Sequence, residues 1–268
     1  MKLESTYTLF LIRQVLILED FTIFIYEFVT FIVAIVLVEF SERKWPADAI
    51  DRKDHFSLNF LALTVVMVGS KISDYFVHSF LNYMTFSSFF YPIQVLRGLS
   101  SVPKIICGLL IVDFLLYWVH RAMHVSPLLW KTHRFHHTPK KLFWLSGSRT
   151  SFLHLFLFAI PEVVVPFGIL KMNAEEAAIG FSIAVVVNLW VHTNLKINLG
   201  PLGWFFITPD YHRIHHASNH LSDTNLGFIH TLWDRLFGTY VDPKTVETPF
   251  QLGINDGRAI TLRTILGV

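Results

Sequence analysis

Long apolar stretches divide the chain and decide the solvent in which it can fold. A helix that spans a bilayer needs about 20 mainly apolar residues, and residues 21–40 and 56–77 meet that length despite Glu27, Lys71 and Asp74. Shorter apolar runs cover residues 105–119, 152–170 and 177–191. Charged residues make up only 16% of the 268 positions, whereas a soluble domain has about 25%. We therefore expect an all-α integral membrane protein, with the last two runs forming a helical hairpin inserted wholly or in part.

The organisation of the chain follows from the same pattern. Residues 1–104 are expected to hold the N-terminal membrane helices, residues 105–241 a catalytic region that includes the hairpin and folds together with the first part, and residues 242–268 a C-terminal tail. Residues 9–18 are too short to span, and their placement stays open. A net charge of +2 gives no sign of a nucleic-acid partner. With Cys107 as the single cysteine, any metal must be held by His, Asp or Glu.

Eight of the 14 histidines fall in three short clusters, HRAMH at 120–124, HRFHH at 133–137 and HRIHH at 212–216. Residues three or four apart share one face of a helix, so each cluster offers a convergent set of imidazoles. Eight imidazoles exceed the four ligands of a structural zinc ion, and imidazole suits Fe, Zn, Cu and Ni alike. Chance recurrence is disfavoured because ionisable side chains near a membrane are costly. The pattern predicts a two-metal centre held by His120, His124, His133, His136, His137, His212, His215 and His216.

Further residues could complete or support this centre. His192 ends the apolar run 177–191 and is a candidate ninth ligand, and Asn188, one turn earlier, could offer an amide oxygen or hold a water. Metal-bound imidazoles usually donate their second N–H to a carboxylate or carbonyl. Asp113 lies seven residues before His120, on the same helix face, and is our candidate for that partner. The sequence leaves open whether His154 and His220 bind metal.

Other polar residues near the clusters have a less specific reading. Asp210, Asp223, Asn225 and Asp234 crowd the third cluster, but each could equally cap a helix or form a turn. The histidines at positions 55, 78 and 230 are expected at the surface or the membrane interface.

The charges indicate where the clusters lie. Residues 121–149 contain six basic and no acidic residues, which favours the cytoplasmic side of the membrane. An even number of crossings between residues 152 and 191 would return the chain to the same side, so all three clusters can meet. The more polar segment from residue 201 onward is expected to form a helical cap over the site.

The three clusters, as they stand, resemble the histidine boxes of the membrane fatty acid hydroxylase and sterol desaturase superfamily. WVHTN at 190–194, TPDYHRIHHASN at 208–219 and TNLGFIHTLWDRLFGTY at 224–240 are similar to its bacterial branch, which is related to alkylglycerol monooxygenase. The resemblance covers residues 105–241. It implies a non-haem di-iron centre that uses dioxygen to attack a C–H bond of a lipid chain or sterol, in a membrane bundle with a cytosolic catalytic cap. The eight box histidines carry over, His192 matches an additional ligand position, and Asn188 stands where relatives often have another histidine.

These observations favour a lipid hydroxylase, with a desaturase as the alternative because both reactions begin with hydrogen abstraction. A zinc-dependent membrane hydrolase and a metal transporter are further alternatives, and zinc could also substitute for iron in an oxygenase. Nothing in the chain resembles a fused cytochrome b5 domain, so we expect a separate electron donor that is cytochrome b5-like, a ferredoxin or a reductase. The expected location is a bacterial inner membrane, with the histidines on the cytoplasmic side.

Overall fold

The computed structural model describes residues 25–26, 28–53, 56–85, 98–197, 199–248 and 250–268. These residues form helices joined by loops, and extended pairing among them is limited to isolated bridges such as Pro46 with Leu195. The prediction of an all-α fold is confirmed. The labelled α-helices are α2 (Phe56–Thr85), α4 (Ser101–Val125), α5 (Pro127–His133), α6 (Phe152–Val163), α7 (Ala174–Val191), α8 (Pro209–His215), α9 (Leu232–Phe237) and α10 (Leu262–Leu266).

Shorter helical segments connect these elements. The segment η3 (Val164–Ile169) is a π-helix, and the 3-10 helices are η2 (Ser146–Ser148), η4 (Gly200–Trp204), η5 (His220–Asp223) and η6 (Pro243–Thr245). The π-helix continues α6 directly, where Pro161 lies inside the helix and Pro166 follows. Proline has no N–H to donate to the preceding turn, so a change of helical winding here has a local cause.

Within the described part of the chain, four helical segments are long and apolar enough to cross a membrane: Phe56–Phe80, Ser101–Val125, Phe152–Ile169 and Ala174–Val191. They include the apolar runs predicted from residue 56 onward. The apolar run at 105–119 lies within α4, which continues through the whole HRAMH cluster to Val125, as the helical spacing of His120 and His124 indicated. The span predicted at 21–40 is only partly described: residues 28–40 are helical, whereas 21–24 and 27 lie outside the described residues, as do residues 1–20.

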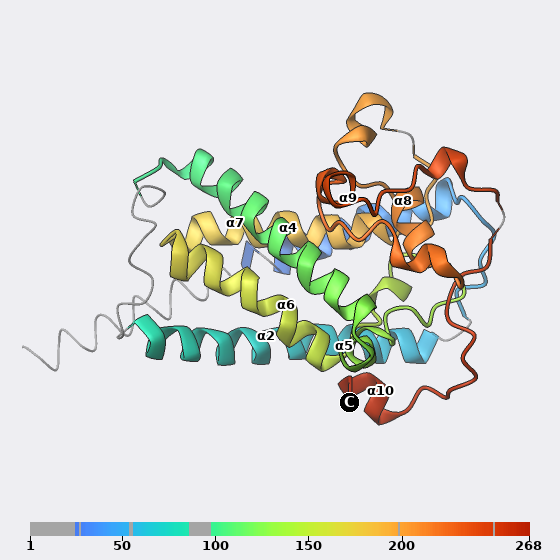
Figure 1. Cartoon of the computed structure of the whole chain (residues 1–268), viewed down its shortest axis with the longest axis horizontal. Coiled ribbons are helices and arrows are strands. Elements are labelled where there is room, and N and C mark those ends of the chain that lie inside the picture. Colours follow the sequence, from blue (N-terminus) through green and yellow to red (C-terminus); the bar gives the residue numbers. More distant parts are fainter. Residues whose placement is uncertain (1–24, 27, 54–55, 86–97, 198, 249) are drawn as a thin grey trace, which may run out of the picture.

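Helix α4 lies at the centre of this bundle. It packs against both α6 and α7, while α2 runs along α6 (Figure 1). Its buried residues, among them Ile105, Asp113 and His120, follow helical spacing, so one stripe of the helix faces the interior. Lys104 at its start pairs with Glu176 of α7 at 3.1 Å. The two arms of the predicted hairpin are thus joined through α4.

Two short helices with the same start signal carry histidines of the other clusters: α5 ends at His133, the first residue of HRFHH, and α8 ends at His215 within HRIHH. Ser126 caps α5 and Thr208 caps α8, and each is followed by a proline in the first turn. A side-chain cap with proline at the first helical position is a strong start signal. Both helices run for seven residues and lie at the same end of the bundle as the end of α4 (Figure 1). The three clusters therefore meet.

Candidate metal centre

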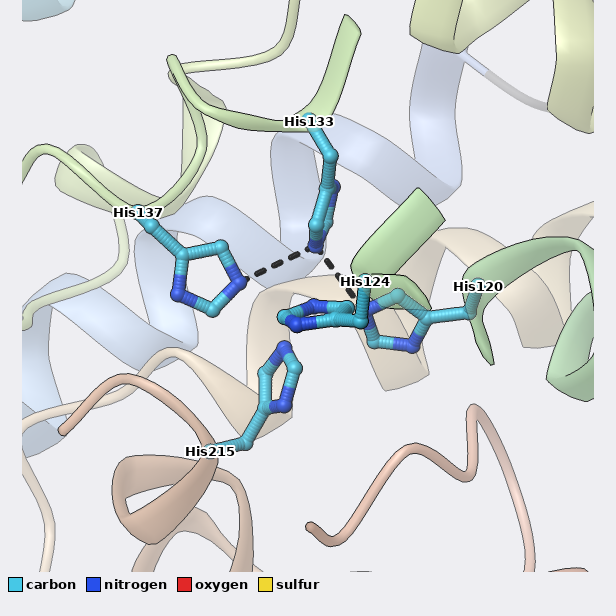
Figure 2. Close-up of side chains that lie close together, drawn as sticks. All are labelled: His120, His124, His133, His137 and His215. Atoms are coloured by element: carbon cyan, nitrogen blue, oxygen red, sulfur yellow. Dashed lines mark hydrogen bonds between the residues drawn. The ribbon is translucent and has the colours of Figure 1, made fainter. Parts of the chain in front are cut away.

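The nine histidines predicted as ligands come together in two adjacent groups. In each group, one nitrogen from every member lies within 4.8 Å of the others. Figure 2 shows the first group, with its rings converging from α4, α5, the turns after α5, and α8. The first group is His120, His124, His133, His137 and His215, and the second is His136, His192, His212 and His216.

The clusters do not each form a separate set. HRAMH serves only the first group, but the other two clusters are divided between both groups. In each divided cluster the two histidines four residues apart stay together, His133 with His137 and His212 with His216, while the histidine three residues after the first turns to the other group. Each of these clusters therefore joins the two groups through its own backbone.

The assumption of a helix across HRFHH was only partly right. α5 ends at His133, and residues 134–137 form consecutive turns. In these turns His136 N–H donates to the carbonyl of His133, and His137 N–H donates to the carbonyl of Arg134. The ring of His136 stacks on that of His133, with centroids 5.0 Å apart, but its nitrogen belongs to the second group.

The rings of His136 and His192 show that the second group fits a metal cation. His136 Nδ1 lies 3.3 Å from the Arg149 carbonyl, and His192 Nδ1 lies 2.7 Å from the Asn188 carbonyl. Because a carbonyl only accepts, each Nδ1 carries the proton, and each Nε2 of a neutral ring presents a lone pair. The two Nε2 atoms are nevertheless 3.1 Å apart. A bound cation would convert this repulsive contact into two coordination bonds.

The first group has the same character. His120 Nδ1 donates to the Leu226 carbonyl at 2.8 Å and His215 Nδ1 to the Thr224 carbonyl at 3.1 Å, which leaves both Nε2 atoms as lone pairs. His120 Nε2 lies 2.9 Å from His133 Nε2, and His133 Nε2 lies 3.0 Å from His137 Nε2. The Nε2 atoms of His124 and His215 are buried without a hydrogen-bond partner. These donors suit a metal that accepts imidazole.

Burial keeps the ligand rings neutral. It lowers the pKa of His192 to about 4. Burial, followed by repulsion from neighbouring imidazoles, lowers the pKa of the other members of both groups outside the spans well below the usual range for histidine. Neutral imidazole is the form that binds metal, so no deprotonation is needed near neutral pH.

A loop after α8 orients two of these rings. Its residues Thr224 and Leu226 supply the carbonyls that hold His215 and His120. The start of this loop is fixed by Asp234, which is fully buried and accepts from the main-chain N–H groups of Leu226 and Gly227 at 2.7 Å. Asp234 also accepts from Tyr211 and from Thr239. This carboxylate therefore connects the loop to the helix that carries HRIHH.

Asp113 fixes the other end of the same loop. The sequence pointed to a contact with His120, but the carboxylate instead accepts from Ile229 N, His230 N, His230 Nδ1 and Trp233 Nε1 at 2.7–3.2 Å. His230 is buried, so the expectation of a surface histidine was wrong. Sequence reasoning missed this pairing because the two residues lie 117 positions apart. Asp113 therefore contacts the loop whose Leu226 carbonyl accepts from His120, and not His120 itself.

The remaining candidates divide by position. His154 is buried beside the first group, with its Nδ1 3.0 Å from that of His133, but it belongs to neither group. His220 is exposed and also belongs to neither. Asp223 lies 3.2 Å from His124 Nδ1, and Asn225 braces the loop by bonding Tyr211 O and Val241 O. His55 lies outside the described residues, and the half-buried ring of His78 packs on Phe167.

Gly147 packs against a ring of the second group, a contact that the sequence did not reveal. A Cβ atom placed on it would lie 2.3 Å from Cγ of His192. The η2 turn thus passes directly against a ring of the second group, and only glycine leaves room for it. The signal in the sequence was a glycine between two serines, which is common in any loop.

A cavity of about 230 Å³ leads from the histidines into the membrane bundle. His120, His133, His136, His192 and His212 line one end of it. Its walls come from α2, α6 and α7, with apolar side chains such as Phe158, Phe181 and Val185, and the side chain of Asn188 lies among them. The ionisable residues Lys71, Asp74 and Glu162 interrupt this apolar lining. A hydrocarbon chain lying in this cavity could reach both histidine groups.

Comparison with known proteins places these features in a family. The family model for fatty acid hydroxylases matches residues 105–239. The chain is 33% identical to alkylglycerol monooxygenase from Xenopus tropicalis over 143 residues, which are 50% of this chain and 29% of that protein. It is 30% identical to the ornithine lipid hydroxylase OlsE from Rhizobium tropici over 161 residues (60% and 47%), and 28% identical to lathosterol oxidase from Rattus norvegicus over 153 residues (54% and 48%).

These matches span less than half the length of each relative. No solved structure matches the chain. The matched segment nevertheless contains all three histidine clusters, the loop that orients their rings and both carboxylates that hold that loop. The chain belongs to the fatty acid hydroxylase family.

Proposed function

We propose that this protein hydroxylates a C–H bond of a membrane lipid, using dioxygen and electrons from a separate donor, with one iron ion in each histidine group. The observation that carries the proposal is the position of the two histidine groups. They lie at one end of a cavity whose walls are formed by candidate membrane helices. Membership of the fatty acid hydroxylase family supports the same reaction class.

The residues around the cavity have distinct tasks in this reaction. The histidines would hold the ions, and two bound iron ions would supply the redox chemistry that allows dioxygen to attack an unactivated C–H bond. The apolar walls bind the hydrocarbon and exclude water from the reacting carbon. Asn188 lies on the cavity wall one turn before His192, where its amide could hold a water or a polar group of the substrate.

The substrate class follows from the cavity and from the relatives. Alkylglycerol monooxygenase, ornithine lipid hydroxylase and lathosterol oxidase are named for molecules that join a polar group to a large apolar body. The cavity has the matching character, because ionisable residues, Lys71, Asp74 and Glu162, lie among apolar side chains such as Phe158, Phe181 and Val185. We infer a lipid whose polar group lies within the reach of these side chains.

The alternatives make different use of the same residues. A desaturase would need the same two histidine groups and the same cavity, so only the product distinguishes it from a hydroxylase. A zinc-dependent hydrolase would need only one metal-activated water, which leaves the second group unexplained. A transporter would need polar residues along a path through the spans, whereas the two groups gather at one end of the bundle.

We place the histidine end on the cytoplasmic side of a bacterial inner membrane. The support is the run of six basic and no acidic residues between positions 121 and 149, which flanks the end of α4 and the start of α6.

Lipid mass spectrometry of host cells grown under ¹⁸O₂, with and without the gene, tests the proposal. Hydroxylation adds one labelled oxygen to a lipid, desaturation removes two hydrogens without label, and hydrolysis divides a lipid without label. The variant with both His136 and His212 replaced by Ala controls for expression in the membrane. A lipid profile that is unchanged by the active gene, in several lipid backgrounds, would contradict the proposal.

A further inference from the structure

A second, larger cavity lies on the side of α8 that faces away from the cavity in the membrane bundle. It is a cleft of about 900 Å³ between α8, the loops at residues 47–50 and 140–141, and the C-terminal tail. None of its lining residues belongs to the four candidate membrane spans. It shares no lining residue with the cavity that leads from the histidines into the bundle. The metal centre thus lies between a membrane cavity and an aqueous cleft.

The cleft is strongly basic. Its charged lining consists of two acidic residues, Asp48 and Asp210, and five basic ones, Lys140, Lys141, Lys196, Arg213 and Lys244. Both carboxylates lie against one of the basic residues: Asp48 is 3.6 Å from Arg213, and Asp210 attracts the same guanidinium. The four lysines are exposed, and none of them forms an ion pair with another described residue. Five basic and two acidic side chains give the lining a net charge of +3, and the four lysines are exposed to water.

The floor of the cleft is the helix that carries HRIHH. Arg213 and Ile214 line the cleft, whereas His212 and His215 on the same helix belong to the two metal groups. The opposite wall also reaches a ligand residue directly, because Gly253 N, next to the lining residue Leu252, donates to the carbonyl of His216 at 3.0 Å. An α-helix with its side chains is about 10 Å across. Only that thickness of protein separates the cleft from the metal groups.

We propose that an acidic electron-carrier protein docks in this cleft and passes electrons through α8 and His216 to the metal centre. The inference rests on the proposed function. Insertion of one oxygen atom from O₂ into a C–H bond gives the alcohol and one water, and it consumes two electrons and two protons. A one-electron carrier must therefore dock and be oxidised twice in each turnover. Complementary charge accelerates such repeated, short-lived encounters, and a carrier that presents carboxylates fits four exposed lysines.

Purified enzyme in nanodiscs can test the cleft with two defined carriers, an acidic plant-type [2Fe–2S] ferredoxin supplied by its NADPH reductase and the soluble domain of cytochrome b5. The double variant Lys140→Glu/Lys141→Glu and the single variants Lys196→Glu and Lys244→Glu reverse charges in the cleft. Lys131→Glu reverses an exposed charge on α5, outside the cleft, as the matched control. Each protein is also assayed for single-turnover product with dithionite, which needs no docking site.

We expect the double variant to raise the KM for the better carrier by about tenfold or more at low salt and to weaken the dependence of the rate on ionic strength, with dithionite-driven product unchanged. Lys131→Glu should behave as wild type. Unchanged KM values in the cleft variants, or failure of both carriers to reduce wild-type enzyme that gives product with dithionite, would overturn the inference. It would also be overturned if the cleft variants differed from wild type only by weaker binding to vesicles of anionic lipid, with unchanged kinetics for both carriers. Absence of product from wild-type enzyme with dithionite would instead refute the proposed function.

Discussion

Replacing Asp113 by Asn tests whether the loop after α8 controls the metal centre from a distance. One carboxylate oxygen accepts from Ile229 N, and the other accepts three bonds, from His230 N, His230 Nδ1 and Trp233 Nε1. An Asn side chain can keep its oxygen on the side with three donors. Its NH₂ group then faces the N–H of Ile229, and one buried donor loses its acceptor.

The size of the effect follows from this single loss. A buried donor left without its partner costs about 1–3 kcal/mol. That energy bears on the loop whose Leu226 carbonyl holds the ring of His120. Since about 1.4 kcal/mol corresponds to a factor of ten, we expect iron retention and turnover to fall by about 10–100-fold, the range usual for groups that orient metal ligands.

The assay measures iron per protein after dialysis against a chelator, together with kcat, KM and the melting temperature. Asp113→Asn should lower iron retention and kcat while KM for the lipid stays near its wild-type value, because Asp113 does not line the cavity. Trp233→Phe removes one of the four donors and leaves the carboxylate in place, so it should have a smaller effect. Wild-type iron content and kcat in Asp113→Asn would refute the coupling through the loop.

Four further predictions follow from the site. Replacing any one of the eight box histidines by Ala should abolish turnover and lower bound iron without preventing membrane insertion, and full activity in two such variants would contradict the two-metal centre. Gly147→Ala should displace the ring of His192 and lower metal content, whereas Gly180→Ala, where a Cβ meets no other atom, should not. Chelator-treated protein should lose thermal stability as the pH falls from about 6.5 towards 4. In this range the histidines of the unfolded chain take up protons, whereas buried rings such as His192, with a pKa of about 4, do not. Equal melting temperatures across this pH range would contradict the prediction. Reporters fused after Lys141 and at the C-terminus should both read as cytoplasmic, and opposite readings would place the clusters in different compartments.

Much of the arrangement could be predicted because it depends on short-range periodicity. Apolar runs of sufficient length marked the helices that begin near residues 56, 152 and 177. Spacings of three and four residues marked the histidines that the structure brings together. Hydropathy alone marked only residues 105–119 of α4, because its final turns carry the polar HRAMH cluster. The spacing of His120 and His124 indicated that the helix continues, as it does to Val125.

The features that escaped prediction depend on contacts between distant parts of the chain. Asp113 lay on the expected helix face, but its partners are 116 to 120 positions away, and no local pattern pairs them. The division of HRFHH and HRIHH between two groups depends on how residues 133–137 and 212–216 lie against one another in the fold, which the spacing within each cluster does not show. His230 was assigned to the surface because a single histidine beside apolar residues carries no sign of the carboxylate that meets it in the fold.

The division of HRFHH and HRIHH between the two groups has a thermodynamic consequence for loading the protein with metal. Ordering residues 133–137 around one ion also positions His136 for the other, and ordering residues 212–216 has the same effect through His215. The conformational entropy of fixing these segments is lost once, when the first ion binds. The second ion then binds to a prepared site, so uptake is positively cooperative, and a protein given too little iron should divide into molecules with two ions and molecules with none.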